Sequence, residues 1–157
     1  MEQFDNEKAK RVWQRVQSTS APPPEPSLEL QELIAREAED AAIYLRLSRQ
    51  IQGRDGALLR QMYEQELSHA SILKGICALN TGRRPTAPTT PVQTAPAEVL
   101  LRRCYGREKQ SLAEYERRSN DPQHGSVFRK MAEQEQSHCR SLLEILGRLE
   151  QKKPRRR

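Results

Sequence analysis

Aromatic residues, β-branched residues and long apolar runs are all scarce in this sequence. Aromatics make up 4% of its 157 residues, and the helix formers Leu, Ala, Glu, Gln and Arg dominate instead. No stretch reaches the roughly 18 apolar residues that a membrane-spanning helix needs. The composition therefore predicts one all-α domain of ordinary size without a membrane segment.

Cysteine is present, but its pattern does not suit a disulfide framework or a zinc knuckle. Cys77, Cys104 and Cys139 are odd in number, widely spaced and without a C-x-x-C pair. This pattern is typical of small buried side chains in a reducing compartment. The charged N-terminus also lacks the apolar segment of a secretory signal. We expect a cytoplasmic protein.

Outside its C-terminal tail, the chain has no large excess of positive or negative charge. The formal net charge is +6, but five of the 27 basic residues lie within 152–157, and the remaining 22 nearly balance the 21 acidic residues. A basic tail of this kind can contact nucleic acid or an anionic surface, or can be a disordered solubilising end. We favour the disordered end for 151–157 and expect no nucleic-acid partner.

Two proline-rich stretches, 21–26 and 84–96, divide the sequence, because neither can be helical inside. Between and after them we predict helices over 27–52, 57–80, 97–118 and 123–150. Short turns join the first pair and the last pair, so each pair forms an antiparallel hairpin. A long crossover joins the hairpins, which predicts an antiparallel four-helix bundle over 27–150.

The first 26 residues form a separate segment, a short helix followed by a proline-rich linker. Phe4, Val12, Trp13 and Val16 fall on one face of that helix. This face suits a docking peptide for a partner or a shell, or a helix that packs on the bundle or across a dimer.

An internal repeat carries the chemistry. Residues 62–69 and 131–138 both read M-x-E-Q-E-x-S-H, at an offset of 69. Glu37 and Tyr44 match Glu108 and Tyr115 at an offset of 71. The pattern indicates duplication of a helical hairpin.

Each predicted helix has an apolar stripe with the helical period of 3.6 residues, and each stripe is interrupted at mid-length by acidic residues. Glu-x-x-His occurs twice, which places both side chains on one helix face. The interrupting residues are Glu37, Glu66, His69, Glu108, Glu135 and His138.

Converging buried carboxylates repel one another and are costly unless something compensates them. Two divalent cations would balance four glutamates, with the histidines neutral. Each Glu-x-x-His pair can then bind one metal, and Glu37 and Glu108 can bridge the two ions. The sequence therefore predicts a two-metal centre, with iron, manganese or a mixed pair.

Four further residues of the repeats have weaker assignments. Glu64 and Glu133 fall off the stripes, and we expect them to be solvated or, at most, to lie behind the metal ligands without binding metal. Tyr44 and Tyr115 fall on the stripes two turns from Glu37 and Glu108. They suit hydrogen bonds that orient a metal-bound carboxylate or histidine of the other half, or an ordinary core position.

With these residues the chain resembles the ferritin-like superfamily, and within it the rubrerythrin-type and bacterioferritin-type di-iron carboxylate proteins. The resemblance covers 27–150. It implies a ferritin-like bundle and a di-iron site that reacts with oxygen or hydrogen peroxide, with a role in oxidative stress. The paired C-x-x-C motifs of a rubredoxin domain are absent, and Ser111 stands where rubrerythrins carry an extra glutamate.

Three functions follow from these observations. The first is a di-iron oxidoreductase that reduces peroxide or oxygen and needs an external electron donor. The second is an iron-handling ferroxidase or carrier, perhaps packaged in a shell. The third is a metal-free helical interaction protein. For the first two we expect a homodimer.

Overall fold

The structure is a computed structural model that describes residues 27–152, and this part of the chain contains helices and no strand. The helices are α2 (Leu28–Gln50), α3 (Gly53–Thr81), α4 (Ala97–Arg118) and α5 (Gly125–Gln151). The all-α prediction is confirmed for these residues. The predicted N-terminal helix and most of the predicted tail lie outside them. None of the four helices has the length and apolarity needed to cross a membrane.

Helix boundaries agree with the prediction except at α3. Ser27 caps α2 by accepting a hydrogen bond from the Leu30 backbone N–H. The predicted start of the second helix at residue 57 is wrong, because α3 begins at Gly53 and the turn before it is shorter. Gly56 is inside α3, where an added Cβ would collide with the carbonyl oxygen of Ile51. This glycine serves close packing of the hairpin rather than the turn itself.

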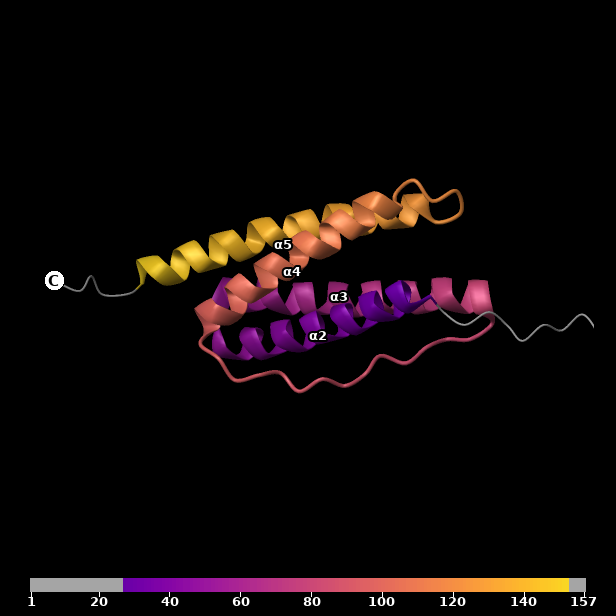
Figure 1. Cartoon of the computed structure of the whole chain (residues 1–157). Coiled ribbons are helices and arrows are strands. Elements are labelled where there is room, and N and C mark those ends of the chain that lie inside the picture. Colours follow the sequence, from indigo (N-terminus) through magenta and orange to yellow (C-terminus); the bar gives the residue numbers. More distant parts are fainter. Residues whose placement is uncertain (1–26, 153–157) are drawn as a thin grey trace, which may run out of the picture.

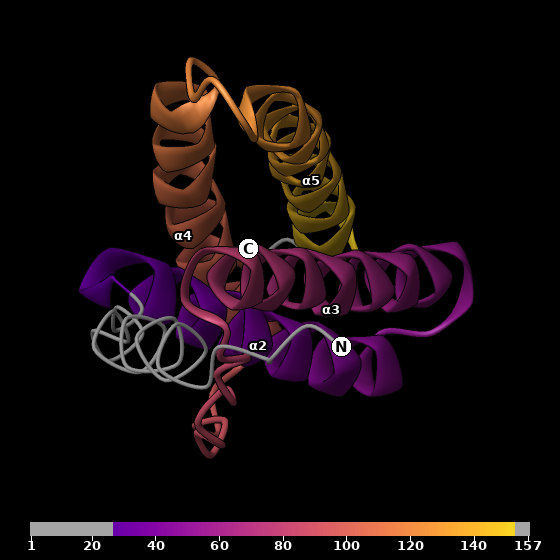
Figure 2. The ribbon, with the colours of Figure 1, turned by 90° about the vertical axis from the view of Figure 1, so that its right-hand side faces the viewer.

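The four helices form two hairpins stacked one on the other (Figure 1). Helix α2 packs against α3 and α4 against α5, and the hairpins meet along α2–α4 and α3–α5. Figure 2 shows that the α4–α5 hairpin crosses the α2–α3 hairpin at a clear angle. Every packed pair is antiparallel, so side chains from all four helices can meet at mid-length.

The crossover between the hairpins, residues 82–96, runs back along the outside of α2 (Figure 1). It leaves α3 at Gly82, which has a left-handed φ of 71° that glycine adopts without strain. Arg46 of α2 holds its far end through the Val92 carbonyl (3.3 Å) and the Thr94 hydroxyl (3.2 Å). This return makes α4 run in the same direction as α3.

The apolar interior is divided into two clusters, one toward each end of the bundle. The first includes Leu47, Leu59 and Leu142, and the second includes Ile34, Leu73 and Phe128. Polar side chains lie between the clusters on all four helices. The fold therefore encloses a polar layer between two apolar ends.

Candidate metal centre

All six predicted ligands lie in the polar layer, and none is more than 2% exposed. Helix α2 supplies Glu37 and α4 supplies Glu108, and the other four residues come from α3 and α5. Their donor atoms fall into two groups, in each of which the atoms lie within 4.8 Å of one another. The interrupted stripes therefore do converge, at a depth where water does not compensate charge.

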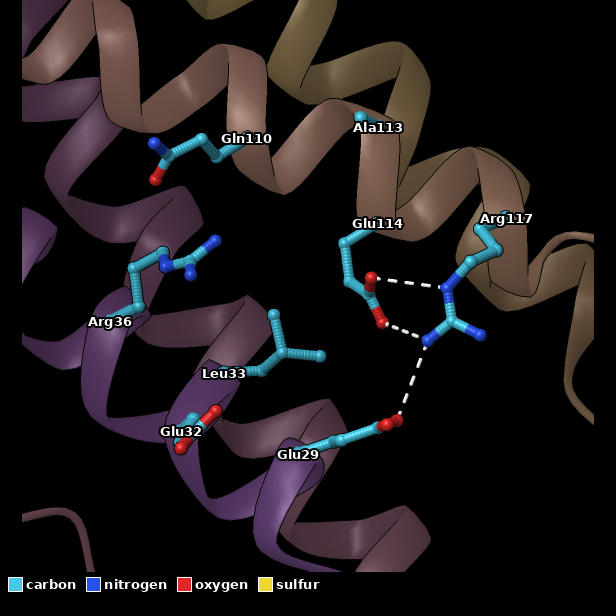
Figure 3. Close-up of a pocket in the computed structure, with 8 residues that line it drawn as sticks. All are labelled: Glu29, Glu32, Leu33, Arg36, Gln110, Ala113, Glu114 and Arg117. Atoms are coloured by element: carbon cyan, nitrogen blue, oxygen red, sulfur yellow. Dashed lines mark hydrogen bonds and ion pairs between the residues drawn. The ribbon is translucent and has the colours of Figure 1, made fainter.

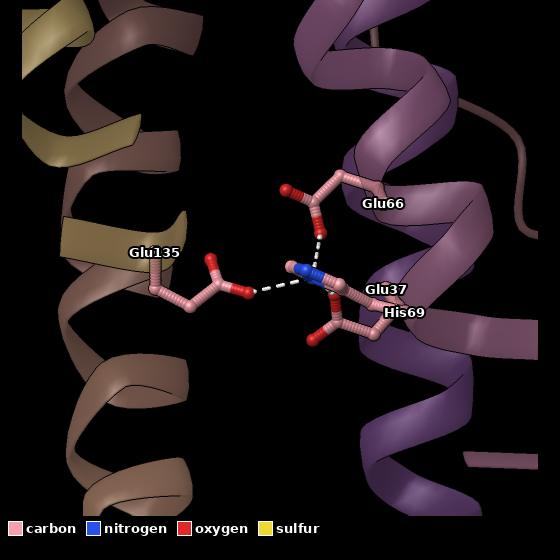
Figure 4. A group of neighbouring side chains, drawn as sticks. All are labelled: Glu37, Glu66, His69 and Glu135. Carbon is pink, nitrogen blue, oxygen red and sulfur yellow. Dashed lines mark hydrogen bonds and ion pairs between the residues drawn. The ribbon is translucent and has the colours of Figure 1, made fainter. Parts of the chain in front are cut away.

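The first group surrounds Nδ1 of His69 (Figure 4). That nitrogen lies 2.8 Å from Glu135 Oε1, 3.2 Å from Glu37 Oε2 and 3.6 Å from Glu66 Oε2. Figure 4 shows Glu135 reaching across from the other hairpin toward His69. We call this set the first position.

The second group surrounds Nδ1 of His138 in the same manner. That nitrogen lies 2.8 Å from Glu66 Oε1, 3.4 Å from Glu108 Oε2 and 3.5 Å from Glu135 Oε2. We call this set the second position. The two rings are neighbours, with centroids 6.2 Å apart.

Glu66 and Glu135 belong to both positions, whereas Glu37 and Glu108 belong to one each. The expectation that Glu37 and Glu108 bridge the two ions therefore differs from the structure, in which the shared carboxylates are those of Glu66 and Glu135. The reason is tertiary: α3 and α5 face each other across the middle of the layer. The carboxylate of each Glu-x-x-His pair thus reaches its own histidine and that of the facing helix.

Within residues 27–152, several potential metal-ligand atoms of the layer make no hydrogen bond, although they lie close to one another. These buried atoms are Glu66 Oε1, both carboxylate oxygens of Glu135, and Nδ1 of His138. Buried polar atoms are almost always hydrogen-bonded, so such a group of unpaired donors needs an explanation. Oxygen and imidazole nitrogen atoms that converge without hydrogen bonds fit divalent cations.

The pKa values show the cost of this layer without metal. Burial raises the pKa of Glu37 and of Glu108 well above the ordinary value, and neighbouring Glu66 and Glu135 raise both further. Burial alone would lower the pKa of His138, but the surrounding carboxylates raise it to about 12. Protons thus occupy the layer in the metal-free protein, in the places that cations would take.

Both predicted tyrosines donate hydrogen bonds to a carboxylate of the other hairpin. Tyr44 on α2 bonds Glu108 on α4, and Tyr115 on α4 bonds Glu37 on α2 at 2.5 Å. Burial raises the pKa of each phenol well above 10, so each keeps its proton and donates it. The hydrogen bonds cross between halves, as the first of the two sequence-based interpretations expects.

Two glutamines that the sequence reasoning missed orient the histidines. Gln134 Oε1 lies 2.8 Å from Nε2 of His69, and Gln65 Oε1 lies 2.8 Å from Nε2 of His138. An amide oxygen accepts, so each Nε2 keeps a proton, and loss of the second proton would leave the Nδ1 lone pair free to bind a cation in the layer. The signal was the Gln that both M-x-E-Q-E-x-S-H repeats contain at the same place.

A buried acidic residue, Asp40, was also missed. It is 2% exposed and lies one turn after Glu37, and its Oδ1 accepts a hydrogen bond from Arg107 Nε at 2.5 Å. Burial raises the pKa of Asp40 to about 7, against the opposing effect of Arg107. Glu64 and Glu133, in contrast, are exposed as expected.

Comparison with known proteins adds no relative. No family model, no curated protein and no solved structure matches this chain. What the centre does must therefore be argued from its own geometry.

Proposed function

We propose that this chain is a ferritin-like di-metal carboxylate protein whose centre holds two iron ions. One observation supports this above the others: two groups of buried ligand atoms share Glu66 and Glu135, and three of their four carboxylate oxygens lack hydrogen bonds to residues 27–152. Two carboxylates common to two positions are what a pair of neighbouring cations requires. Inward-facing Glu-x-x-His motifs in a four-helix bundle are typical of di-iron and di-manganese proteins.

The charges support two divalent ions rather than one. Four glutamates carry four negative charges, and two neutral histidines complete the set, so two divalent cations leave the layer with no net charge. One ion would leave two negative charges in an apolar interior, where desolvation is costly. Carboxylate and imidazole ligands suit iron and also manganese, so a mixed pair fits the same donors.

We infer an oxidoreductase activity toward peroxide or oxygen. Bound ferrous ions would supply the electrons, and an external donor would restore them. The chain would position the ligands and exclude water from the centre. Tyr44 and Tyr115 hold the carboxylates of Glu108 and Glu37 by hydrogen bonds, and Gln65 and Gln134 orient the imidazoles. The two apolar clusters exclude water on either side of the layer.

A second candidate, a ferroxidase or iron carrier, is favoured by Ser111. This residue is buried and has a hydroxyl where rubrerythrin-type proteins carry another glutamate. The six-ligand centre would therefore bind its ions through one carboxylate fewer than a rubrerythrin-type centre does. Weaker binding of this kind suits release of oxidised iron. A homodimer, packaging in a shell and a cytoplasmic location remain predictions of this proposal. The three described cysteines are free and buried, which fits a reducing compartment.

Metal analysis and stopped-flow kinetics test the proposal. We expect two equivalents of iron per chain after anaerobic reconstitution. Peroxide that oxidises the ferrous protein much faster than oxygen does, with turnover when a reductant is present, supports the oxidoreductase. A single turnover that retains oxidised iron supports the ferroxidase. A chain that binds no iron or manganese contradicts both and leaves the metal-free interaction protein.

A further inference from the structure

The two halves of the centre match closely but not completely. At the 71-residue offset, Arg36 matches Arg107 and Glu37 matches Glu108. The match fails at two buried places beside the ligands. Asp40 is replaced by Ser111 in the second copy, and Leu33 by Cys104. The environment of one metal position therefore differs from that of the other.

The extra carboxylate lies on the side of the second position. Asp40 precedes Tyr44 by one turn on α2, and Tyr44 donates its hydrogen bond to Glu108, a ligand of the second position only. The Asp40 carboxylate also accepts a hydrogen bond from Arg107, the residue that precedes Glu108 on α4. Asp40 and Tyr44 thus form a polar corner next to Glu108.

Arg107 keeps the Asp40 carboxylate in place without filling the corner. Its Nε donates to Asp40, and its terminal nitrogens reach Glu39 (3.0 Å) and the Arg36 carbonyl (3.3 Å). The Arg107 side chain is 22% exposed, whereas that of Asp40 is 3% exposed. Water therefore screens the positive end of this pair more than the buried negative end, which faces the interior.

At the corresponding corner of the first position, Ser111 stands where the other half has Asp40. The buried hydroxyl oxygen of Ser111 has no hydrogen-bond partner among residues 27–152. Arg36, the counterpart of Arg107, points into a pocket of about 490 Å³ between α2 and α4 (Figure 3). The dashed lines in Figure 3 join Glu29, Glu114 and Arg117, and Arg36 forms no ion pair with any residue from 27 to 152.

We propose that the two metal positions are inequivalent and fill in order, the second position (Glu108 and His138) before the first (Glu37 and His69). The buried Asp40 carboxylate, when ionised, adds negative potential near the second position, and Ser111 adds none at the first. This inference rests on the proposed metal centre and specifies how it loads. Because outer groups of this kind change metal affinity by about 10- to 100-fold, the expected separation is of that order.

Anaerobic titration of the metal-free protein with Co²⁺, followed by calorimetry and by visible absorption, tests the order of loading. We expect two steps whose dissociation constants differ by about tenfold or more. His138→Ala is expected to remove the tighter step, and His69→Ala the weaker one. Asp40→Ser copies the Ser111 corner and should bring the two constants to within about threefold by weakening the tighter step.

Controls separate the charge of Asp40 from a structural role. Glu39→Gln removes a partly exposed carboxylate that also contacts Arg107, and it should leave the separation unchanged. Ser111→Asp should strengthen the weaker step, because it supplies a carboxylate at the position that matches Asp40. Asp40→Asn keeps the shape of the side chain and replaces Asp40→Ser if that variant does not fold by circular dichroism.

Two equal steps in the wild type, or a separation that survives both Asp40 variants, would overturn the inference while leaving the metal centre intact. Loss of the tighter step in His69→Ala instead of His138→Ala would reverse the order and also overturn it. If no Co²⁺ binds, the inference fails together with the proposed function.

Discussion

The ends of the bundle and the layer between them bury side chains to the same depth for opposite reasons. Leu59 at one end and Leu73 at the other are fully buried. Transfer of each side chain from water into the apolar interior stabilises the fold by about 1.5–3 kcal/mol. Glu66 and Glu135 are buried as deeply, but leaving water costs free energy for a carboxylate. The comparison teaches that burial of the apolar ends stabilises the fold, whereas burial of the polar layer is costly unless protons or, as we propose, cations compensate its charge.

The largest effect is expected from a shared ligand. Glu66→Ala removes a carboxylate common to both positions, so iron content should fall from two equivalents per chain to nearly none. Elemental analysis after anaerobic reconstitution measures this. Glu64→Ala, two residues away and exposed, is the matched control and should keep both ions. Retention of two tightly bound ions by Glu66→Ala would contradict the sharing of this residue.

An apolar end should respond in the opposite way. Leu59→Ala leaves a cavity in the first cluster and should lower the free energy of unfolding of the metal-free protein by about 2–5 kcal/mol. The metal content should stay at two equivalents. Urea denaturation and elemental analysis measure the two quantities, and Leu79→Ala, at an exposed position, should change neither. Loss of metal from Leu59→Ala with little loss of stability would break the comparison.

The third prediction is that rising pH destabilises the metal-free protein but strengthens metal binding. The folded pKa of His138 is raised to about 12, so its stabilisation of the metal-free protein is full below its unfolded pKa near 6.5 and is lost as pH rises from 6.5 toward 12. The raised pKa values of Glu37 and Glu108 act in the same direction at lower pH. The metal-free protein should therefore become less stable as pH rises above 6.5.

Metal binding should strengthen over the same range, because cations displace the protons that Glu37, Glu108, His69 and His138 hold. Thermal denaturation of the metal-free and Co²⁺-loaded protein between pH 6 and 9 measures both trends. Calorimetry in two buffers of different ionisation enthalpy should show net proton release. Proton uptake on binding, or a metal-free protein that gains stability as pH rises, would contradict this account of the layer.

The smallest effect is expected from the groups that orient the ligands. Gln134→Ala removes the acceptor for Nε2 of His69 and should weaken Co²⁺ binding at the first position by about 10- to 100-fold. Gln134→Glu, which keeps an acceptor, should restore most of the affinity. Gln136→Ala, an exposed change on the same helix, is the control. Equal losses in Gln134→Ala and Gln136→Ala would show that helix α5, rather than the hydrogen bond, is affected.

Helical periodicity predicted much of this protein because the stripes and breakers are local signals. The predicted helix over 97–118 matches α4 at both ends, and Pro96 marks its start. The same reasoning misplaced the start of α3, because Gly53 and Gly56 read as a turn, whereas Gly56 provides room for Ile51 inside a packed hairpin. A local signal does not distinguish a flexible glycine from one that permits close contact.

The sequence alone determined which residues line the centre, since a buried stripe of period 3.6 fixes the face that each residue occupies. Tertiary structure decided what each does. The crossing of the two hairpins makes Glu66 and Glu135 the shared carboxylates and sends Gln65 and Gln134 to the histidines of the opposite hairpin. It also brings Arg107, the neighbour of Glu108 on α4, to the Asp40 carboxylate of α2. Periodicity specifies a direction around one helix, but distances between helices depend on the angle at which they pack.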